Sequence, residues 1–385
     1  MIGAMFIGLS GMQAYSNGLR QISNNITNLN TPGFKATDLT FQGMFGDSGQ
    51  SSGLGYGVTL ADSRLSMKQG EVRLSDNPLD LAVDGEGFLV LLGDDEILYT
   101  RTGSFEVGPD GDIILSGTQY KLAVLDDTGQ ATPVNIESHR ISQPQATQSI
   151  TFSDNLSSTA TEHTVAAIDV FNALGEQDSW DIRFEKDTSV TNQNSWTVIV
   201  ENSAGVEIAR ETLSFIAGVV DPLTSSFTVE DVDGGYSIEL DFSSGVTSFS
   251  SGSVSTLRLD DSDGYGIGEI TSLTANENGE FELTYSNGQD QTLGAIALAT
   301  LRDLSSITQT GRGLFRYDAN KRVDLSPSSR ETVGTVVGSA AEASNVDLSS
   351  EFGDLILIQR GYQASSQVVS VSNDMIQQLF GLRGR

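Results

Sequence analysis

The sequence contains no cysteine, only two histidines and only seven prolines in 385 residues. Without cysteine the chain can form neither disulfides nor thiolate metal sites. Cysteine usage therefore does not indicate whether the protein works in an oxidising or a reducing compartment. No proline lies in residues 1–31 or 328–385, so proline prevents neither end of the chain from being helical. Both ends are therefore candidates for long helices.

Basic residues and long apolar runs are also scarce. The chain has 21 Lys and Arg against 51 Asp and Glu, a net charge of −30. Nucleic acids and anionic membranes are bound by basic surfaces, so we expect neither as a partner. No run approaches the ~18 apolar residues of a membrane span, and the longest candidate, Leu293–Leu301, indicates a core strand or a short helix. No basic segment precedes an apolar run at Met1, so we expect no cleaved secretory signal.

The sequence offers little for catalysis. His139 and His163 are too few for a typical zinc site. Residues 49–53 match a nucleophile-elbow pattern but lie in a Gly/Ser-rich stretch without the strand and helix that this motif needs. Residues 259–270 resemble a calcium loop, but Leu259 and Ile270 occupy its first and last ligand positions. We expect no enzyme activity, no cofactor, and no catalytic or metal site.

Apolar residues recur every seven positions near both ends of the chain. Such repeats specify helices that wind around other helices. We therefore expect helices over residues 1–30 and 346–385, and we interpret their apolar seam as the polymerisation seam. Its residues are Met5, Met12, Tyr15, Leu19, Ile22, Ile26 and Leu29 at the front and Leu348, Leu355, Tyr362, Val369 and Ile376 at the back.

These ends are nearly uncharged, and the first is rich in glycine. Residues 1–34 contain one charged side chain, Arg20. Each glycine in a helix interior costs about 1 kcal/mol relative to alanine, and short isolated helices are marginal in water. We expect both ends to be disordered in a free subunit and helical in an assembly. The alternative is a single intramolecular coiled-coil stalk.

The sequence between the ends is typical of β-structure. Residues 236–242 alternate apolar and polar side chains, as in a strand with one buried face. Turns are predicted at Asn278-Gly279, Asn287-Gly288, Asp110-Gly111 and Asp263-Gly264. Residues 147–263 hold 20 acids and 4 bases, a net of −16, which favours a domain that projects into water.

The predicted fold is multidomain: a discontinuous N- and C-terminal α-helical coiled-coil domain plus two mainly-β domains, inserted one within another. The expected parts are the terminal helical domain of the inner tube (1–30 and 346–385), a connector (31–70 and 330–345), an inner β-domain (71–146 and 264–329) and an outer acidic β-domain (147–263).

Several phrases of the sequence resemble the signatures of bacterial flagellar rod and hook proteins. Residues 10–14 and 22–35 resemble the N-terminal signature, 77–88 and 99–105 the next two blocks, and 344–348 and 359–364 the C-terminal signature. The motif residues are Ser10, Gly11, Asn24, Asn25, Asn28, Thr31, Pro32, Gly33, Phe34, Asn345, Val346, Asp347, Gln359, Arg360 and Tyr362. Blocks in this order make a chance match very unlikely.

Within that family an extra β-domain, here residues 147–263, is typical of the hook. The resemblance implies a structural subunit of the extracellular hook, exported by the flagellar type III apparatus. It would polymerise with itself into a flexible helical tube that transmits torque from the rod to the filament and forms part of the export channel. Its implied partners are rod, hook cap and hook-filament junction proteins, with no nucleic acid and no membrane.

Two other functions remain open from the sequence. One is a distal rod protein with an insertion, although a rod within its bushing leaves little room for an outward acidic domain. The other is a secreted β-rich adhesin or calcium-dependent hydrolase, against which the incomplete calcium loop weighs.

Overall fold

The computed structural model describes residues 2–44, 57–61, 64–126, 128–188, 194–232, 234–318, 320–328 and 333–382. The nucleophile-elbow pattern at 49–53 lies outside these residues. The chain forms two compact units. The terminal unit comprises Met1–Glu137, Leu273–Leu283 and Gln291–Arg385, and the central unit comprises Ser138–Ser272 and Thr284–Asp290.

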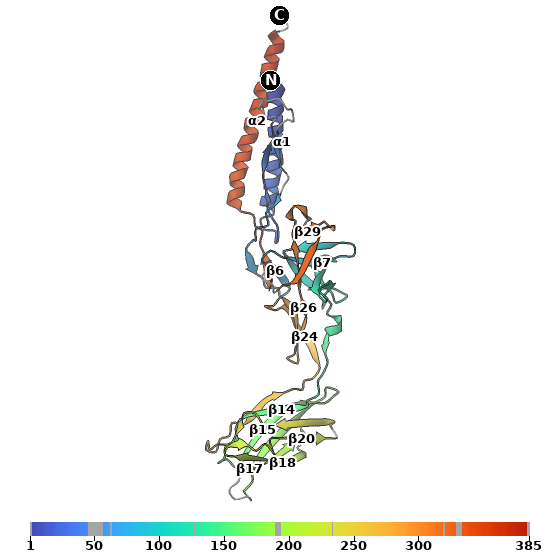
Figure 1. The fold of residues 1–385 in the computed structure, drawn as a ribbon, viewed down its shortest axis with the longest axis vertical. Helices are drawn as coiled ribbons and strands as arrows, with labels where there is room; N and C mark the ends of the chain where they lie inside the picture. Colours follow the sequence, from blue (N-terminus) through green and yellow to red (C-terminus); the bar gives the residue numbers. More distant parts are fainter. Residues whose placement is uncertain are drawn as a thin grey trace. The chain divides into compact units, whose positions relative to one another are not determined.

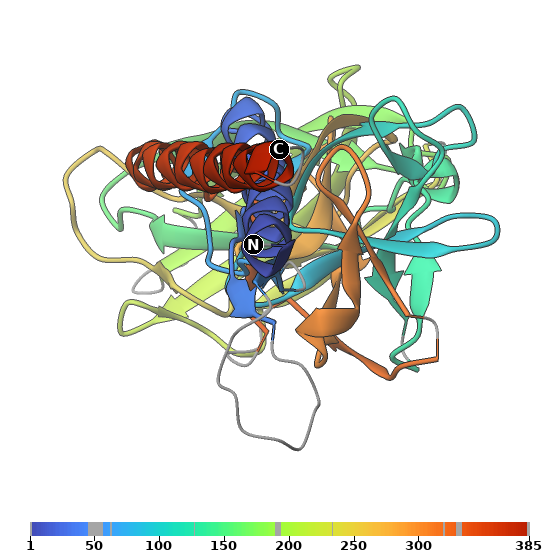
Figure 2. The same cartoon turned by 90° about the horizontal axis from the view of Figure 1, so that it is seen from above.

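The terminal unit contains two long helices, α1 (Ile2–Thr27) and α2 (Leu348–Leu382), which lie side by side and antiparallel (Figure 1, Figure 2). α1 ends just before a turn that contains Pro32 and Gly33, and Gly33 has a φ of +69°. α2 begins after Asp347, whose carboxylate accepts hydrogen bonds from the backbone N–H groups of Ser349 and Ser350 and caps the helix. The prediction of a helix at each end is confirmed.

Both helices are formed in the structure, and the expectation that they order only in an assembly stays a prediction. Each helix supplies part of the apolar surface that the other needs. None of the helices within the described ranges is long and apolar enough to span a membrane.

A 12-stranded sheet forms the body of the terminal unit, with the path β28-β29-β8-β7-β11-β10-β9-β6-β31 and with β12, β27 and β30 attached. Its strands are β6 (Asp80–Asp84), β7 (Phe88–Leu92), β8 (Ile97–Thr100), β9 (Thr102–Val107), β10 (Ile113–Leu115), β11 (Lys121–Leu125), β12 (Ala131–Pro133), β27 (Ala297–Leu301), β28 (Ile307–Gln309), β29 (Leu314–Tyr317), β30 (Val323–Pro327) and β31 (Thr335–Gly338). Successive residues of β7 belong to two cores, with Leu89 in one and Phe88 and Val90 in the other. Both faces of this strand are therefore buried.

Three two-stranded sheets lie in the segments that join the helices to this body. They pair β1 (Thr37–Asp38) with β4 (Arg64–Leu65), β2 (Phe41–Gly43) with β3 (Val58–Leu60), and β5 (Val72–Leu74) with β32 (Ala340–Glu342). A four-stranded sheet contains β13 (Ile141–Ser142), β24 (Gly268–Ala275), β25 (Glu280–Tyr285) and β26 (Asp290–Ala295). Short 3₁₀ helices cover Glu137–His139 and Leu304–Ser306.

The central unit is built on a ten-stranded sheet with the path β15-β16-β17-β18-β19-β22-β14-β21-β20 and with β23 paired to β14. Its strands are β14 (Ser149–Asn155), β15 (Glu162–Phe171), β16 (Gln177–Lys186), β17 (Asn194–Glu201), β18 (Glu207–Ile216), β19 (Val219–Val220), β20 (Ser226–Asp231), β21 (Tyr236–Asp241), β22 (Val246–Thr247) and β23 (Arg258–Ser262). Its core includes Trp180, Trp196 and Phe242, all fully buried. The predicted alternation is confirmed in β21, where Tyr236, Ile238 and Leu240 are buried.

Three of the four predicted turns are confirmed, since Gly111, Gly279 and Gly288 all have positive φ. The turn predicted at Asp263-Gly264 is wrong. The Asp263 carboxylate instead accepts hydrogen bonds from backbone N–H groups of residues 148 and 149 at 2.8 and 3.0 Å. A Cβ on Gly264 would lie 1.9 Å from Thr147 Oγ1, so the glycine allows a close approach rather than a turn.

Candidate functional site

A stripe of small residues brings the two terminal helices together. The buried positions of α1 are Gly8, Gly11, Ala14, Gly18, Ile22 and Asn25. A Cβ on Gly11 would lie 2.6 Å from Ser365 Oγ, and one on Gly361 would lie 2.5 Å from the ring of Tyr15. Glycines on both helices therefore let the backbones approach closely. The sequence predicted only that the glycines of α1 destabilise the helix, and this packing role is an additional finding. The three- and four-residue spacing of Gly8, Gly11, Ala14 and Gly18 places these small residues on one face.

The buried side-chain amide of Asn25 fixes the end of the helix pair at which α1 ends and α2 begins. The Asn25 side chain donates to Glu351 Oε1 at 2.8 Å and to Thr37 O at 3.1 Å, and its Oδ1 accepts from Thr37 N at 3.1 Å. Burial raises the pKa of the Glu351 carboxyl, and the hydrogen bond from Asn25 opposes that rise. A buried polar residue in a helix–helix seam fixes register, because a shifted register leaves it without partners.

The residues of the predicted seam lie on or beside this intramolecular face. Ile22 is fully buried, Met5, Met12, Tyr15, Ile26 and Leu29 are half-buried, and Leu19 is exposed. On α2, Leu355, Val369 and Ile376 are half-buried, whereas Leu348 and Tyr362 are exposed. Val369 faces Gly8 of the same chain. The single chain therefore has the intramolecular pairing that the sequence left as the alternative, and a role of this seam between subunits stays a prediction.

The outer faces of the helix pair carry many apolar side chains exposed to solvent. They are Ile2, Phe6, Ile7 and Leu9 on α1 and Phe352, Ile356, Leu357, Val368, Val371, Met375 and Leu379 on α2. Apolar surface of this extent is typical of a site of protein association. We call these residues the outer apolar faces. They fall outside the seven-residue repeat from which the seam was predicted.

A buried charge cluster ties both ends of the chain to the β-body. Glu342 accepts from Lys35 Nζ at 2.7 Å, from Arg101 Nε at 3.1 Å and from Gly70 N at 2.8 Å. All three charged side chains are almost inaccessible to solvent. Burial lowers the pKa of the Lys35 ammonium, although the Glu342 carboxylate opposes that shift.

The motif residues between the helices and the body satisfy buried backbone groups. Asn345 accepts from Ala36 N at 2.7 Å and donates to the carbonyls of Ser66 and Lys68, each at 2.8 Å. Phe34 and Val346 pack together in a small core. The structure thus brings the N- and C-terminal signatures into contact. By contrast, Gln359 and Arg360 of the C-terminal motif are exposed on α2.

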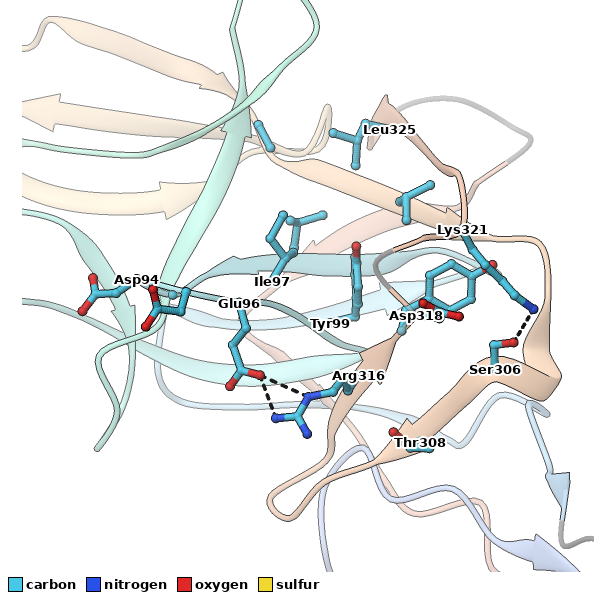
Figure 3. Close-up of a pocket in the computed structure, with 16 residues that line it drawn as sticks. Asp94, Glu96, Ile97, Tyr99, Ser306, Thr308, Arg316, Asp318, Lys321 and Leu325 are labelled. Carbon is cyan, nitrogen blue, oxygen red and sulfur yellow. Dashed lines mark hydrogen bonds and ion pairs between the residues drawn. The ribbon is translucent and has the colours of Figure 1, made fainter.

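The terminal unit also contains an open pocket of about 790 Å³ (Figure 3). Glu96 forms an ion pair with Arg316 at 2.7 Å, and hydrogen bonds from Arg316 and Tyr120 lower the pKa of the Glu96 carboxyl. Ser306, also in the pocket wall, accepts from Lys321. Glu96 and Arg316 thus neutralise each other, and the Lys321 ammonium also forms an ion pair with the Asp303 carboxylate. Within the described ranges, no three His, Asp or Glu side chains are grouped so as to hold a metal ion.

Comparisons with known proteins bear on this arrangement. Residues 5–35 match the family model of the flagella basal body rod protein, residues 82–155 that of the flagellar hook protein FlgE/F/G D1 domain, and residues 337–382 that of the flagellar basal body rod FlgEFG protein C-terminal. The chain belongs to the family of bacterial flagellar rod and hook proteins. The resemblance found in the sequence motifs is therefore confirmed.

Flagellar hook proteins match this chain over nearly their whole length. The flagellar hook protein FlgE of Brucella suis is 28% identical over 100% of this chain and 99% of that protein. The one of Escherichia coli is 27% identical over 97% of this chain and 98% of that protein. The crystal structure of Helicobacter pylori flagellar hook protein FlgE2 has a TM-score of 0.47 and 11% identity, covering 70% of this chain and 99% of that one. The two FlgE sequences support a hook subunit, and the family is a structural one that is not known as a family of enzymes.

The packing role of the small-residue stripe can be tested by substituting two glycines of α1. Gly11→Leu should separate α1 from α2, because the side chain has no room beside Ser365. We expect a loss of about 1–3 kcal/mol, typical of overpacking. Gly3→Leu is the control, since a Cβ there meets nothing within 4 Å. Thermal melting of the helical circular dichroism measures both, and equal melting of the two variants would contradict close packing at the stripe.

Proposed function

We propose that the chain polymerises through its terminal helices into the helical tube of the flagellar hook. The outer apolar faces carry this proposal, because they are exposed in a single chain and α1 and α2 cover only one side of each other. Neighbouring copies would bury them, as the hydrophobic effect favours. The seam residues Leu348 and Tyr362, exposed on α2, would join the same contacts.

We propose the domain partition given by the sequence for this subunit. The helical domain (1–30 and 346–385) would line a central channel, and the inner and outer β-domains would lie outside it. The boundary at residues 147 and 263 is supported by the pairing of Gln145 with Tyr265, which places the start and end of the acidic segment side by side. The connector is supported by Asn345, which accepts a hydrogen bond from Ala36 N and donates to the carbonyls of Ser66 and Lys68.

Transmission of torque requires that a twist applied to the helices reaches the β-body. The cluster of Lys35, Glu342 and Arg101 supplies such a connection, since it joins the segment after α1, the strand before α2 and the body sheet. Flexibility would then lie in the contacts between subunits. By family resemblance, the tube would also serve as part of the export channel and contact rod, hook cap and hook-filament junction proteins.

Electron microscopy of the purified full chain tests this proposal. We expect short curved tubes with a central channel that pellet on ultracentrifugation. A chain lacking residues 1–30 should remain soluble, because the bodies bury their own cores while the outer apolar faces are lost from one helix. A wild-type chain that stays monomeric under all assembly conditions, or a truncated chain that still forms tubes, would contradict polymerisation through the helices.

A further inference from the structure

Two stretches of the central unit carry no charge, although the segment that contains them is strongly acidic. Residues 147–263 have a net charge of 4 − 20 = −16, whereas residues 212–220 and 242–257 contain no charged side chain. The two uncharged stretches lie together, because Ser248 N donates to Gly218 O at 2.8 Å. We call them the uncharged face.

The uncharged face also presents apolar side chains to solvent. Ile216, Val219, Phe249 and Val254 are all exposed. They lie near one another through the backbone. Ile216 and Val219 pair across a turn, and Val219 pairs with Thr247, two residues before Phe249. Val254 O accepts a hydrogen bond from Ser251 Oγ, two residues after Phe249. A water-exposed apolar surface within an acidic domain is typical of a contact site.

The turn at the tip of this face is strained. Ala217 has a φ of +51° and Gly218 a φ of +86°. A two-residue hairpin turn of this kind normally carries Asn, Asp or Gly at its first position. The sequence has alanine there, which keeps the tip apolar at a conformational cost. The glycine is required, because a Cβ would lie 2.3 Å from the ring of Phe249.

We propose that the uncharged face contacts a second copy of this chain in the polymer, an inference that rests on the proposed function. Every copy carries a net charge of −30, so two copies repel each other wherever their acidic surfaces meet. The uncharged face lets an equally acidic neighbour approach without that repulsion, and its apolar side chains are buried when it does. A basic partner would instead be drawn to the acidic surface around it.

A spin label can report this contact, because the chain has no cysteine of its own. Val254→Cys places the label on the uncharged face, at a side chain 67% exposed. Leu174→Cys is the matched control, 80% exposed in a turn beside Glu176 and outside the face. In the monomer both labels should be mobile. In the polymer the label at position 254 should become immobile, whereas the label at position 174 should stay mobile.

Charge substitutions give a second measurement on the full chain. Val254→Glu should lower the temperature at which polymers dissociate, and Leu174→Glu should leave it unchanged. Polymers whose label at position 254 is as mobile as that at 174 would overturn this inference and leave the proposed function standing. A chain that forms no polymer at all would overturn both.

Discussion

Replacing Glu342 by alanine should destabilise the terminal unit by about 3–5 kcal/mol, the usual cost of removing one partner from a buried ion pair. The carboxylate is fully buried and is shared by Lys35 and Arg101. Its loss leaves two buried cations without a counter-charge and Gly70 N without its acceptor. Thermal and denaturant unfolding of the full chain, monitored for both units, measure the effect.

Glu71→Ala is the matched control, because Glu71 pairs with Arg73 on the surface with both side chains well exposed. That pair should contribute less than about 1 kcal/mol. The central unit should melt unchanged in both variants, since its core is separate. If Glu342→Ala melts like Glu71→Ala, the cluster does not hold the terminal unit together. If Glu342→Ala is folded but its polymers bend and twist more easily than those of the wild type, the cluster acts chiefly in torque transmission.

The long helices could be predicted because their signal is local. Seven-residue repeats and the lack of proline gave α1 and α2 with their bounds nearly correct. The turns at Gly111, Gly279 and Gly288 were equally local, because the dipeptide sets the backbone. Asp263-Gly264 has the same dipeptide, but there the contact with Thr147, far away in sequence, decided the conformation.

The buried charge cluster could not be predicted, because its members are far apart in sequence. Lys35 and Glu342 are separated by 307 positions, and Arg101 and Glu342 by 241. All three residues lie in or beside phrases that resemble the family signatures, yet a phrase shows that a residue type recurs and not which residue it touches. The pairing depends on tertiary packing, which single-sequence patterns do not contain.

The helix against which the apolar seam packs could likewise not be predicted from the sequence. A heptad repeat predicts that a helix packs against another helix but does not say whether the other helix belongs to the same chain. In the structure Val369 and Tyr15 face the opposite helix of their own chain. The apolar side chains left for other chains are those of the outer apolar faces, and this distinction determines which substitution tests assembly.

Leu357→Asp should abolish polymerisation while leaving the subunit folded. Leu357 lies on the outer apolar faces and is 68% exposed, so the change should alter the stability of a single chain by no more than about 0.5 kcal/mol. In a tube that buries this position, the carboxylate would lose its water at a cost of several kcal/mol. Every subunit of a helical polymer makes the same contact, so this desolvation cost arises at each of them. A surface pair with Arg360, one turn along the helix, offsets at most about 0.5 kcal/mol.

Gln367→Asp is the control, because its line on α2, at seven-residue spacing, already carries Arg360 and Asp374 and therefore tolerates charge. This variant should pellet like the wild type. Leu355→Asp is less informative, since Leu355 is half-buried and its loss would also weaken the subunit itself. Pelleting assays and electron microscopy measure the polymerisation of each variant, and thermal melting confirms that each is folded. Normal tubes from Leu357→Asp would mean that the outer apolar faces stay in water after assembly, and the polymer contacts would have to lie elsewhere on the chain.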